Sequence, residues 1–247
     1  MGDLASATLS IVIPAFNEEA YLPATLEHVR AAASKLAQAG AGQAEIVVVD
    51  NASTDATAAV AASYQTLVVS EALHNVGHVG NVGAQASRGQ VLVFLDADTL
   101  LPPRALVRIA QTMRDPGCVG GAVDLLYRPR RRVVRWYLAA WRLVGKLARV
   151  AMGSGQFCRR DVFSDLGGYD ATIFMGEDVE FFMRLRRLAR RHGLRAPILN
   201  DVVVQPSARR MDAWPLWRIL LLTNPLFILP LRRRRTVWDG WYTKLVR

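Results

Sequence analysis

Short apolar strands alternate with helices through the first hundred residues, and this alternation limits the chain to few folds. The predicted strands are residues 9–13, 45–50, 67–70 and 90–96. The predicted helices between them are residues 19–38, 56–64 and 81–88. Strands that are apolar almost throughout are buried on both faces, as in a parallel sheet covered by helices. The sequence therefore predicts an α/β fold with a mostly parallel sheet flanked by helices.

The second half of the chain is richer in helical periodicity and in arginine. Helices are predicted over residues 133–150 and 178–192, and the latter has an acidic start and a basic end, which suit the helix dipole. Residues 214–231 are strongly apolar but contain Arg218, Asn224 and three prolines. A bilayer-spanning helix needs about 20 clean apolar residues. We therefore expect a C-terminal amphipathic, interfacial helical extension.

Two carboxylates, Asp96 and Asp98, follow the fourth predicted strand directly. Ligands of open α/β sheets bind outside the carboxyl ends of the strands. Two carboxylates one residue apart can reach one hard cation such as Mg²⁺ or Mn²⁺. A solvated turn, or a helix cap at Asp98 or Thr99, explains the same residues. The spacing alone leaves the metal site and the turn equally open.

The first two predicted strands also end in polar residues. Asp50 ends the second strand, and the segment PAFNEE, which begins at Pro14, ends the first. A carboxylate at this edge can accept hydrogen bonds from a ribose or a base. We interpret Ser53, Thr54 and Asp55 as a helix cap. Three strands are thus predicted to deliver polar groups to one rim of the sheet.

Five segments of the chain together resemble the family 2 glycosyltransferases, which have the GT-A fold. They are, in chain order, SIVIPAFNEE, EIVVVDNASTDAT, NVGHVGNVGAQASRGQVLVFLDADT, GSGQFCRRDVFSDLGGYD and GEDVEFFMRLRR. Their joint occurrence in the family's order is far more specific than any one of them. The resemblance implies a GT-A type sheet and an inverting sugar transfer from a nucleotide-diphosphate sugar that uses Mn²⁺ or Mg²⁺.

The resemblance also implies roles for individual residues. Asp98 and Asp96 would hold the metal, and Asp178 would act as the general base on the acceptor hydroxyl. Without the resemblance, Asp178 is an ordinary acidic residue at a helix start. The residues implied in acceptor binding are Gly155, Gln156 and Glu177. Those implied in donor binding are Pro14, Ala15, Phe16, Glu18, Asp50, Asn75, Gly77, Asn81, Asp96 and Ala97.

The chain departs from the family pattern just before Asn81. Many family members have arginine or lysine there, whereas this chain has Gly80. We expect Arg209 and Arg210 to bind the donor diphosphate instead, because paired guanidiniums recognise phosphate; a solvated basic face is the alternative. The segment QPSARR does not match the Gln-x-x-Arg-Trp motif of processive members, so transfer of single sugars is expected.

The formal net charge of +10 indicates acidic partners. Nucleic acid is not expected, because no binding module is recognisable. A dinucleotide-dependent oxidoreductase is excluded, since the turn after the first strand has no glycine. Basic residues recur on one face of the helix 133–150, and four arginines, 232–235, follow the apolar segment. The helical set is Arg135, Arg142, Lys146 and Arg149. These features predict binding to an anionic membrane surface and a lipid-linked acceptor.

We divide the chain into a GT-A domain, residues 1–210, and a basic, apolar, membrane-associating extension, residues 211–247. The donor half of the domain covers about residues 1–100, and the acceptor half about 101–210. The start of the chain does not resemble a secretory signal, so a cytoplasmic protein at the inner face of the membrane is expected. The alternative is a non-catalytic, basic membrane- or nucleic-acid-binding protein with a degenerate transferase fold.

Overall fold

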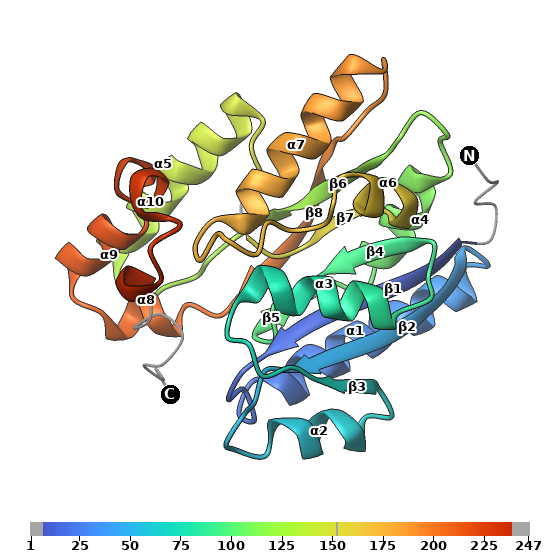
Figure 1. The fold of residues 1–247 in the computed structure, drawn as a ribbon, viewed down its shortest axis with the longest axis horizontal. Helices are drawn as coiled ribbons and strands as arrows, with labels where there is room; N and C mark the ends of the chain where they lie inside the picture. Colours follow the sequence, from blue (N-terminus) through green and yellow to red (C-terminus); the bar gives the residue numbers. More distant parts are fainter. Residues whose placement is uncertain (1–6, 152, 239–247) are drawn as a thin grey trace.

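The computed structural model describes residues 7–151 and 153–238 of the chain. Its first part alternates strands with helices as the sequence predicts (Figure 1). The strands here are β1 (Ala7–Ala15), β2 (Gly42–Asp50), β3 (Leu67–Ser70) and β4 (Val91–Phe94). The helices between them are α1 (Leu22–Gln38), α2 (Thr57–Ser63) and α3 (Val76–Ala86). Helix α3 begins five residues before the predicted start at residue 81, because the side chain of Asn75 accepts a hydrogen bond from the His78 N–H and caps it.

The four strands of this part pair in parallel, in the order β3-β2-β1-β4. From β1 the chain continues first to β2 on one side, and later to β4 on the other side. Crevices that bind ligands in open α/β sheets form at such points, where the strand order reverses. The site predicted from the ends of β1, β2 and β4 therefore lies at the switch point.

The second part of the chain extends the same sheet with strands of mixed direction, giving the order β3-β2-β1-β4-β7-β6-β8-β5. These strands are β5 (Thr99–Leu100), β6 (Gly120–Leu125), β7 (Gln156–Arg159) and β8 (Ile198–Pro206). β7 is antiparallel to both of its neighbours, whereas β6 and β8 are parallel, with a register shift between Val123 and Asp124. The sheet is therefore parallel in its first half and mixed in its second.

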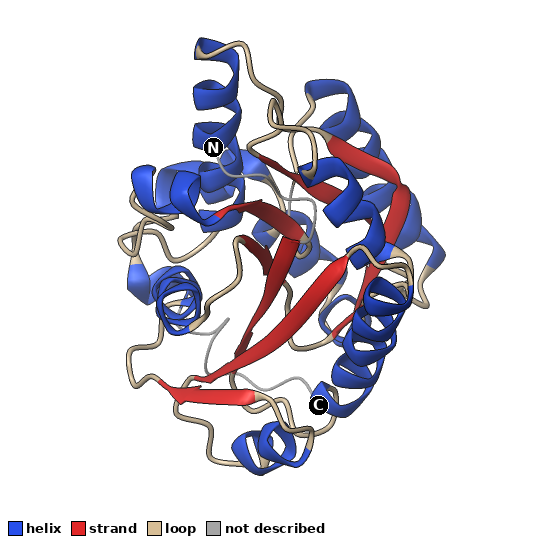
Figure 2. Cartoon of the chain, turned by 90° about the vertical axis from the view of Figure 1, so that its right-hand side faces the viewer, coloured by secondary structure: helices blue, strands red, loops and turns tan. Residues whose placement is uncertain are grey.

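Helices cover both faces of the sheet (Figure 2). Leu9, Ile11 and Ile13 of β1 pack with α1 and α4 (Ala105–Met113) on one face. Val12 of the same strand packs with α3, α6 (Arg160–Asp165) and α7 (Glu177–Arg191) on the other, as strand alternation requires. Helix α3 approaches closely, because a Cβ at Gly83 would lie 2.4 Å from a methyl group of Val12. This contact holds α3 directly above the switch point.

The C-terminal segment packs against the start of α5 (Arg132–Ala148) in three short helices (Figure 1). They are α8 (Arg209–Ala213), α9 (Leu216–Leu222) and α10 (Pro225–Leu231). Val134 of α5 is buried with Met211, Trp214 and Ile219, and Tyr137 Oη lies 3.0 Å from Thr223 Oγ1. In the described part of the chain, no helix combines the length and apolar character needed to cross a bilayer. The last nine residues of the predicted extension, 239–247, lie outside the described residues.

The four basic residues predicted for one face of α5 fall into two groups in the structure. Asp124 on β6 is only 5% exposed, and it receives Arg142 Nη2 at 2.5 Å and Lys146 Nζ at 2.7 Å. These two cations therefore hold α5 on the sheet, whereas Arg135 and Arg149 remain exposed. The face that α5 turns to solvent is largely apolar, since Trp136 is 78%, Leu143 58% and Leu147 77% exposed.

Candidate active site

The ends of β1 and β2 build one side of the site. The two strands are in register to their last pair, Ala15 with Asp50. Beyond it, the loop after β1 is bonded to the loop after β2: Asn17 N–H donates to Ser53 Oγ at 3.0 Å, and Thr54 N–H donates to Asn17 Oδ1 at 2.8 Å. Ser53 and Thr54 thus join the two loops and do not cap α2, which corrects our interpretation of them.

The two loops also carry the residues predicted to bind the base of the donor. Asp50 is 7% exposed, and among the hydrogen bonds of the described residues its carboxylate accepts only a long contact, 3.4 Å, from Ser53 N–H. Phe16 meets His74 edge to face, with ring centroids 4.8 Å apart. Phe16 follows the last residue of β1 and Asp50 is the last residue of β2, so both lie at the same edge of the sheet, and base binding by the two stays a prediction. Pro14 and Ala15 belong to the last residues of β1 below it.

Asp96, Ala97 and Asp98 leave the end of β4 at the switch point. Ala97 is buried, and its carbonyl accepts a hydrogen bond from Thr25 Oγ1 of α1 at 2.8 Å, which fixes the path of the loop. Asp96 N–H donates to Ser154 Oγ at 2.7 Å. The two carboxylates flank this anchored residue just beyond the carboxyl end of β4.

One short loop brings the candidate base to the same place. Gly153 N–H donates to the carboxylate of Asp178, and the next residue, Ser154, accepts from Asp96 N–H. Asp178 is in the first turn of α7, and its main-chain carbonyl accepts from Gln156 Nε2 at 2.9 Å. Residues from β4, β7 and α7, far apart in the sequence, therefore converge on one site.

The carboxylates that converge on this site have raised pKa values. Solvent reaches Asp96, yet the surrounding protein displaces enough water to raise its pKa to about 7, and the charges of Asp98 and Asp178 add to this. Burial likewise raises the pKa of Asp98 and of Asp178. Burial, followed by the charge of Asp178, raises the pKa of Glu177. Such a cluster of acids favours a bound cation.

Two arginines of α8 supply the positive charge that the structure contains at this site. Arg209 Nη2 pairs with Glu18 and lies 3.3 Å from Asp98 Oδ2, and its guanidinium lies 4.2 Å from the centroid of the Tyr21 ring. One carboxylate oxygen of Glu18 and the Nε of Arg209 are buried without a hydrogen-bond partner among the described residues. Burial, and then the charge of Arg209, lowers the pKa of Arg210. The two arginines thus lie beside the acidic rim.

The residues predicted from α3 lie behind the rim and contact the segment that leads to α7. The Nδ2 of Asn75 donates to Ala171 O at 3.0 Å and to Ile173 O at 3.1 Å, and this side chain is 1% exposed. Asn81 exchanges two hydrogen bonds with the main chain of Tyr169. A Cβ on Gly77 would lie 3.5 Å from the Cβ of Glu177. These residues brace the segment that leads to Asp178, and direct contact with a donor stays a prediction for them.

Two of the predicted acceptor residues are also buried. Gly155 has φ +92°, and a Cβ there would lie 2.3 Å from Val123 Cγ2, so glycine permits β7 to pack on β6. Gln156 is 2% exposed and its Oε1 has no hydrogen-bond partner among the described residues. Glu177 lies beside Asp178 at the start of α7 and is half-buried. Acceptor binding by the three residues stays a prediction.

Sequence reasoning missed three residues of the site: Tyr21, Tyr127 and Ser154. Burial, and then the charges of Asp96 and Asp98, raises the pKa of Tyr127, which follows β6. No motif marks Tyr127 or Ser154, and both depend on strands that the sequence pattern did not predict. Tyr21 follows PAFNEE closely, so an aromatic partner for an arginine could have been sought there.

The donor atoms present fit a hard cation. Asp96 and Asp98 offer only oxygen, and the described residues contain no group of three or more His, Cys, Asp or Glu side chains that could enclose a metal by themselves. Mg²⁺ and similar ions are usually held by one or two carboxylates together with substrate phosphates. An incomplete protein ligand set of this kind suits an ion that arrives with a diphosphate.

The chain belongs to glycosyl transferase family 2, whose model matches residues 10–167. This confirms the family that the five sequence segments resemble. It also identifies the site at the end of β4 as lying within the matched part of the chain.

Several relatives share part of the sequence. A dolichyl-phosphate β-glucosyltransferase from Drosophila melanogaster is 36% identical over 139 residues, which are 49% of this chain and 42% of that protein. An undecaprenyl-phosphate 4-deoxy-4-formamido-L-arabinose transferase from Pseudomonas paraeruginosa is 34% identical over 152 residues, 59% of this chain and 42% of that one. An uncharacterised glycosyltransferase from Haemophilus influenzae is 23% identical over 72% of this chain and 61% of its own length. The chain therefore spans less than two thirds of these relatives.

Solved structures confirm the GT-A fold. Glucosyl-3-phosphoglycerate synthase from Mycobacterium tuberculosis, in complex with Mn²⁺, UDP and glucosyl-3-phosphoglycerate, matches with a TM-score of 0.62 at 23% identity, covering 93% of this chain and 80% of that one. A mannosyltransferase from Pyrobaculum calidifontis, in complex with GDP-mannose and Mn²⁺, matches with a TM-score of 0.60 at 23% identity, covering 87% and 60%.

Proposed function

We propose that the chain transfers a single sugar, with inversion, from a nucleotide-diphosphate sugar to an acceptor hydroxyl. The observation that carries this proposal is the loop of Gly153 and Ser154, which holds Asp178 on one side and the Asp96 main chain on the other. This loop supports the proposal because it connects Asp178, the proposed proton acceptor, with the segment that carries Asp96 and Asp98. Structures of fold neighbours with Mn²⁺ and UDP or GDP-mannose support the donor class.

Asp178 acts as the base in this proposal. The Gly153 N–H fixes one of its carboxylate oxygens, which leaves the other to receive the proton of the acceptor hydroxyl. Burial raises the pKa of Asp178, so the carboxylate is a stronger base than an exposed aspartate. Its position at the N-terminus of α7 stabilises the charged form and prevents the pKa from rising further.

The donor diphosphate is bound by residues of the opposite rim. Asp98, with Asp96, would hold Mn²⁺ or Mg²⁺, and the ion would offset negative charge on the leaving diphosphate. Arg209 exchanges its contact with Asp98 for a phosphate oxygen, and Arg210 adds a second guanidinium. Asp50 and Phe16 hold the base.

The test is a screen of UDP-, GDP- and dTDP-sugars with the purified chain and Mn²⁺, read as release of the nucleotide diphosphate. We expect one donor class to be turned over, with release abolished by EDTA. Stereochemistry is read by NMR of the new glycosidic bond. If no donor shifts the melting temperature or is turned over with any acceptor, the non-catalytic alternative replaces this proposal.

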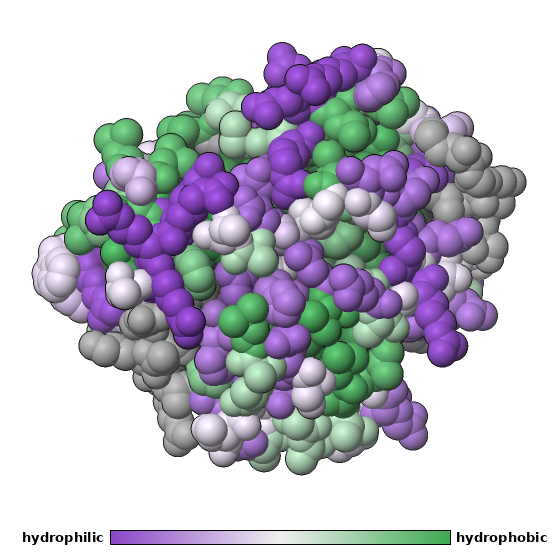
Figure 3. All heavy atoms as spheres, viewed as in Figure 1, coloured by the Kyte–Doolittle hydropathy of each residue, from purple (hydrophilic) through white to green (hydrophobic). Residues whose placement is uncertain are grey.

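We further propose that the acceptor is lipid-linked and that the chain works on an anionic membrane surface in the cytoplasm. An apolar surface extends over α5, α9 and α10, which lie side by side, and it is visible at the upper left of Figure 3. Besides Trp136, Leu143 and Leu147, it includes Trp217 (67% exposed), Leu226 (82%) and Leu229 (56%). Exposed apolar surface of this extent is rarely left to water.

Three further observations support a membrane as the partner of this surface. The exposed arginines Arg233, Arg234 and Arg235 follow α10 after Arg232, and Arg233 pairs with Asp170. Each cation near an anionic surface contributes about 1 kcal/mol. The apolar helices begin only a few residues after Arg209 and Arg210, so the surface borders the active site. Two of the relatives carry names that specify dolichyl-phosphate or undecaprenyl-phosphate. We accordingly assign residues 211–247 to the membrane-associating extension.

Sedimentation with vesicles tests this part. Binding is expected to require anionic lipid, to weaken with salt, and to fall when Trp136 and Leu147 are both changed to Ser. A matched control changes two exposed residues on the far side, Leu67 and Leu73, to Ser. Equal recovery in the supernatant with neutral and anionic vesicles at low salt would remove the membrane from the proposal and leave the sugar transfer untouched.

A further inference from the structure

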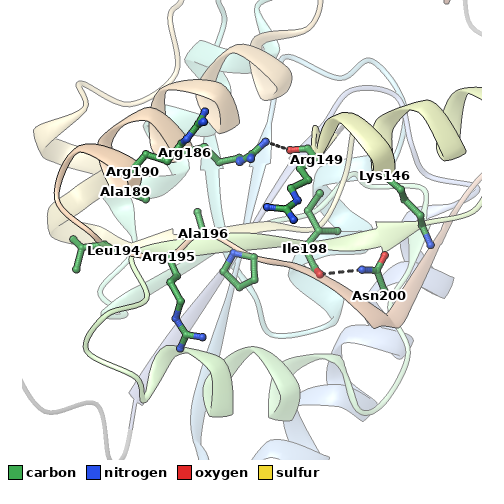
Figure 4. Close-up of a pocket in the computed structure, with 11 residues that line it drawn as sticks. Lys146, Arg149, Arg186, Ala189, Arg190, Leu194, Arg195, Ala196, Ile198 and Asn200 are labelled. Atoms are coloured by element: carbon green, nitrogen blue, oxygen red, sulfur yellow. Dashed lines mark hydrogen bonds between the residues drawn. The ribbon is translucent and has the colours of Figure 1, made fainter.

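A hollow lined by cations lies between the C-terminal halves of α5 and α7, and it shares no lining residue with the donor site (Figure 4). Its volume is about 580 Å³. The floor is apolar and is formed by Leu194, Ala196, Pro197 and Ile198 at the approach to β8. The cations that line it are Lys146, Arg149, Arg186, Arg190 and Arg195.

Two of these five cations are neutralised by carboxylates. Lys146 pairs with Asp124, and Arg195 pairs with Asp115. Arg149, Arg186 and Arg190 have no carboxylate partner within residues 7–151 and 153–238. The hollow therefore carries an uncompensated positive charge from three guanidiniums.

The three guanidiniums are held near one another by the fold. Arg186 donates to the main-chain carbonyls of Ala148 and Arg149, at the C-terminal end of α5. Burial, and then the charges of Arg190 and Arg149, lowers the pKa of Arg186. The side chain of Arg149 hangs into the hollow above Ile198 in Figure 4. Like charges gathered in this way repel one another, and an anion between them removes that cost.

We propose that this hollow is a binding site for a phosphate ester. Guanidiniums donate paired hydrogen bonds that match phosphate oxygens, and three of them line one side of the hollow. The apolar floor suits the carbon skeleton of an ester, which inorganic phosphate lacks. Two sources offer this chemistry: a soluble phosphorylated metabolite and the headgroup of a phospholipid. The proposal is independent of the sugar transfer, because the donor residues lie elsewhere.

Calorimetric titration of the whole chain in EDTA tests the site with two probes, glycerol 3-phosphate and dihexanoyl-phosphatidylglycerol. Saturable binding of either probe is expected. The triple variant Arg149→Gln, Arg186→Gln, Arg190→Gln is expected to weaken it at least tenfold. A charge-matched control changes the exposed arginines Arg30, Arg104 and Arg114 to Gln and is expected to change affinity less than twofold. The source is identified by which probe binds more tightly.

Equal weakening in the two triple variants would overturn the proposal, because it would show an effect of net charge only; absence of saturable binding would do the same. Arg149→Lys keeps the charge and removes the paired N–H donors of the guanidinium, so it is expected to weaken binding severalfold. This variant keeps the proposal testable if the triple variant does not fold. Asp98→Asn separates this site from the proposed function: it should lose metal-dependent UDP binding and keep the affinity for the phosphate ester.

Discussion

The ion pair that fastens α5 to the sheet gives a quantitative test of the packing. Asp124 is 5% exposed and accepts hydrogen bonds from Arg142 Nε at 2.9 Å, from Arg142 Nη2 at 2.5 Å, and from its neighbour Leu125 N–H at 2.8 Å. Lys146 adds a contact at 2.7 Å. Asp124→Asn keeps the shape of the side chain and removes its charge, so it leaves two cations without their partner.

The expected loss follows from burial. Breaking a buried ion pair costs about 3–5 kcal/mol. Arg142 and Lys146 are 32% and 36% exposed, so water compensates them in part, and we expect about 2–3 kcal/mol. For a chain of this length, 1 kcal/mol lowers the melting temperature by roughly 2–4 °C. Asp124→Asn is therefore expected to melt about 5–10 °C below the parent.

Asp201→Asn is the matched control. Its carboxylate lies 2.6 Å from Arg108 Nε, but the two side chains are 56% and 40% exposed. An exposed pair contributes about 0–1 kcal/mol, so a fall of no more than about 4 °C is expected. Differential scanning calorimetry at pH 7 measures both. Equal shifts in the two variants, or an increase for Asp124→Asn, would refute the argument from burial.

The pH dependence of this variant has a definite sign. Burial opposes ionisation of Asp124, but hydrogen bonds from Arg142 and Lys146 outweigh it and lower the pKa below the ordinary 3.8. A lowered pKa stabilises the fold above pH 3.8, and this contribution is lost as the pH falls further. The gap between parent and variant should therefore be constant from pH 7 to about 5 and close in more acidic buffer.

Other predictions concern the active site. Asp98→Ala should abolish donor turnover with Mn²⁺ without lowering the melting temperature; full activity in EDTA would contradict it. Asp178→Asn should reduce kcat by about 10²–10⁴-fold at unchanged donor affinity, measured by steady-state kinetics and titration; a collapse of affinity would make Asp178 a binding residue. Because the pKa of Asp96 is raised to about 7, metal-free protein should lose stability as pH rises from about 4 to 7, and Asp96→Asn should flatten this slope in thermal melts.

The sequence pattern predicts the first half of the fold well, because its strands are buried on both faces and read as apolar runs. It fails for β7, whose residues Gln156 and Arg159 are polar yet 2% and 4% exposed. The guanidinium of Arg159 donates to the main-chain carbonyls of Cys118, Met113 and Asp115, which makes its burial tolerable. Such compensation depends on residues some forty positions away, so composition and periodicity do not reveal it.

The candidate site, too, could be predicted from the sequence only in part. Asp96 and Asp98 could be placed from the strand before them, since the end of a parallel strand is a position that the sequence specifies. The predicted cationic face of α5 could not be judged, because the carboxylate that turns it inward, Asp124, lies on a strand with two glycines and no clear pattern. Arg209 reaches Glu18 across 191 positions of sequence, a pairing that spacing arguments do not address.

The loop of Gly153 and Ser154 has a kinetic consequence. Ser154 accepts from the Asp96 main chain and the adjacent Gly153 donates to the Asp178 carboxylate, so a displacement of Asp96 by a bound donor would reach Asp178 through a single peptide unit. In the proposed reaction, the binding of the two substrates would then be coupled. We expect an ordered reaction in which the donor binds before the acceptor, because donor binding would set the reactivity of Asp178, the proposed base. An acceptor that binds first would not be turned over.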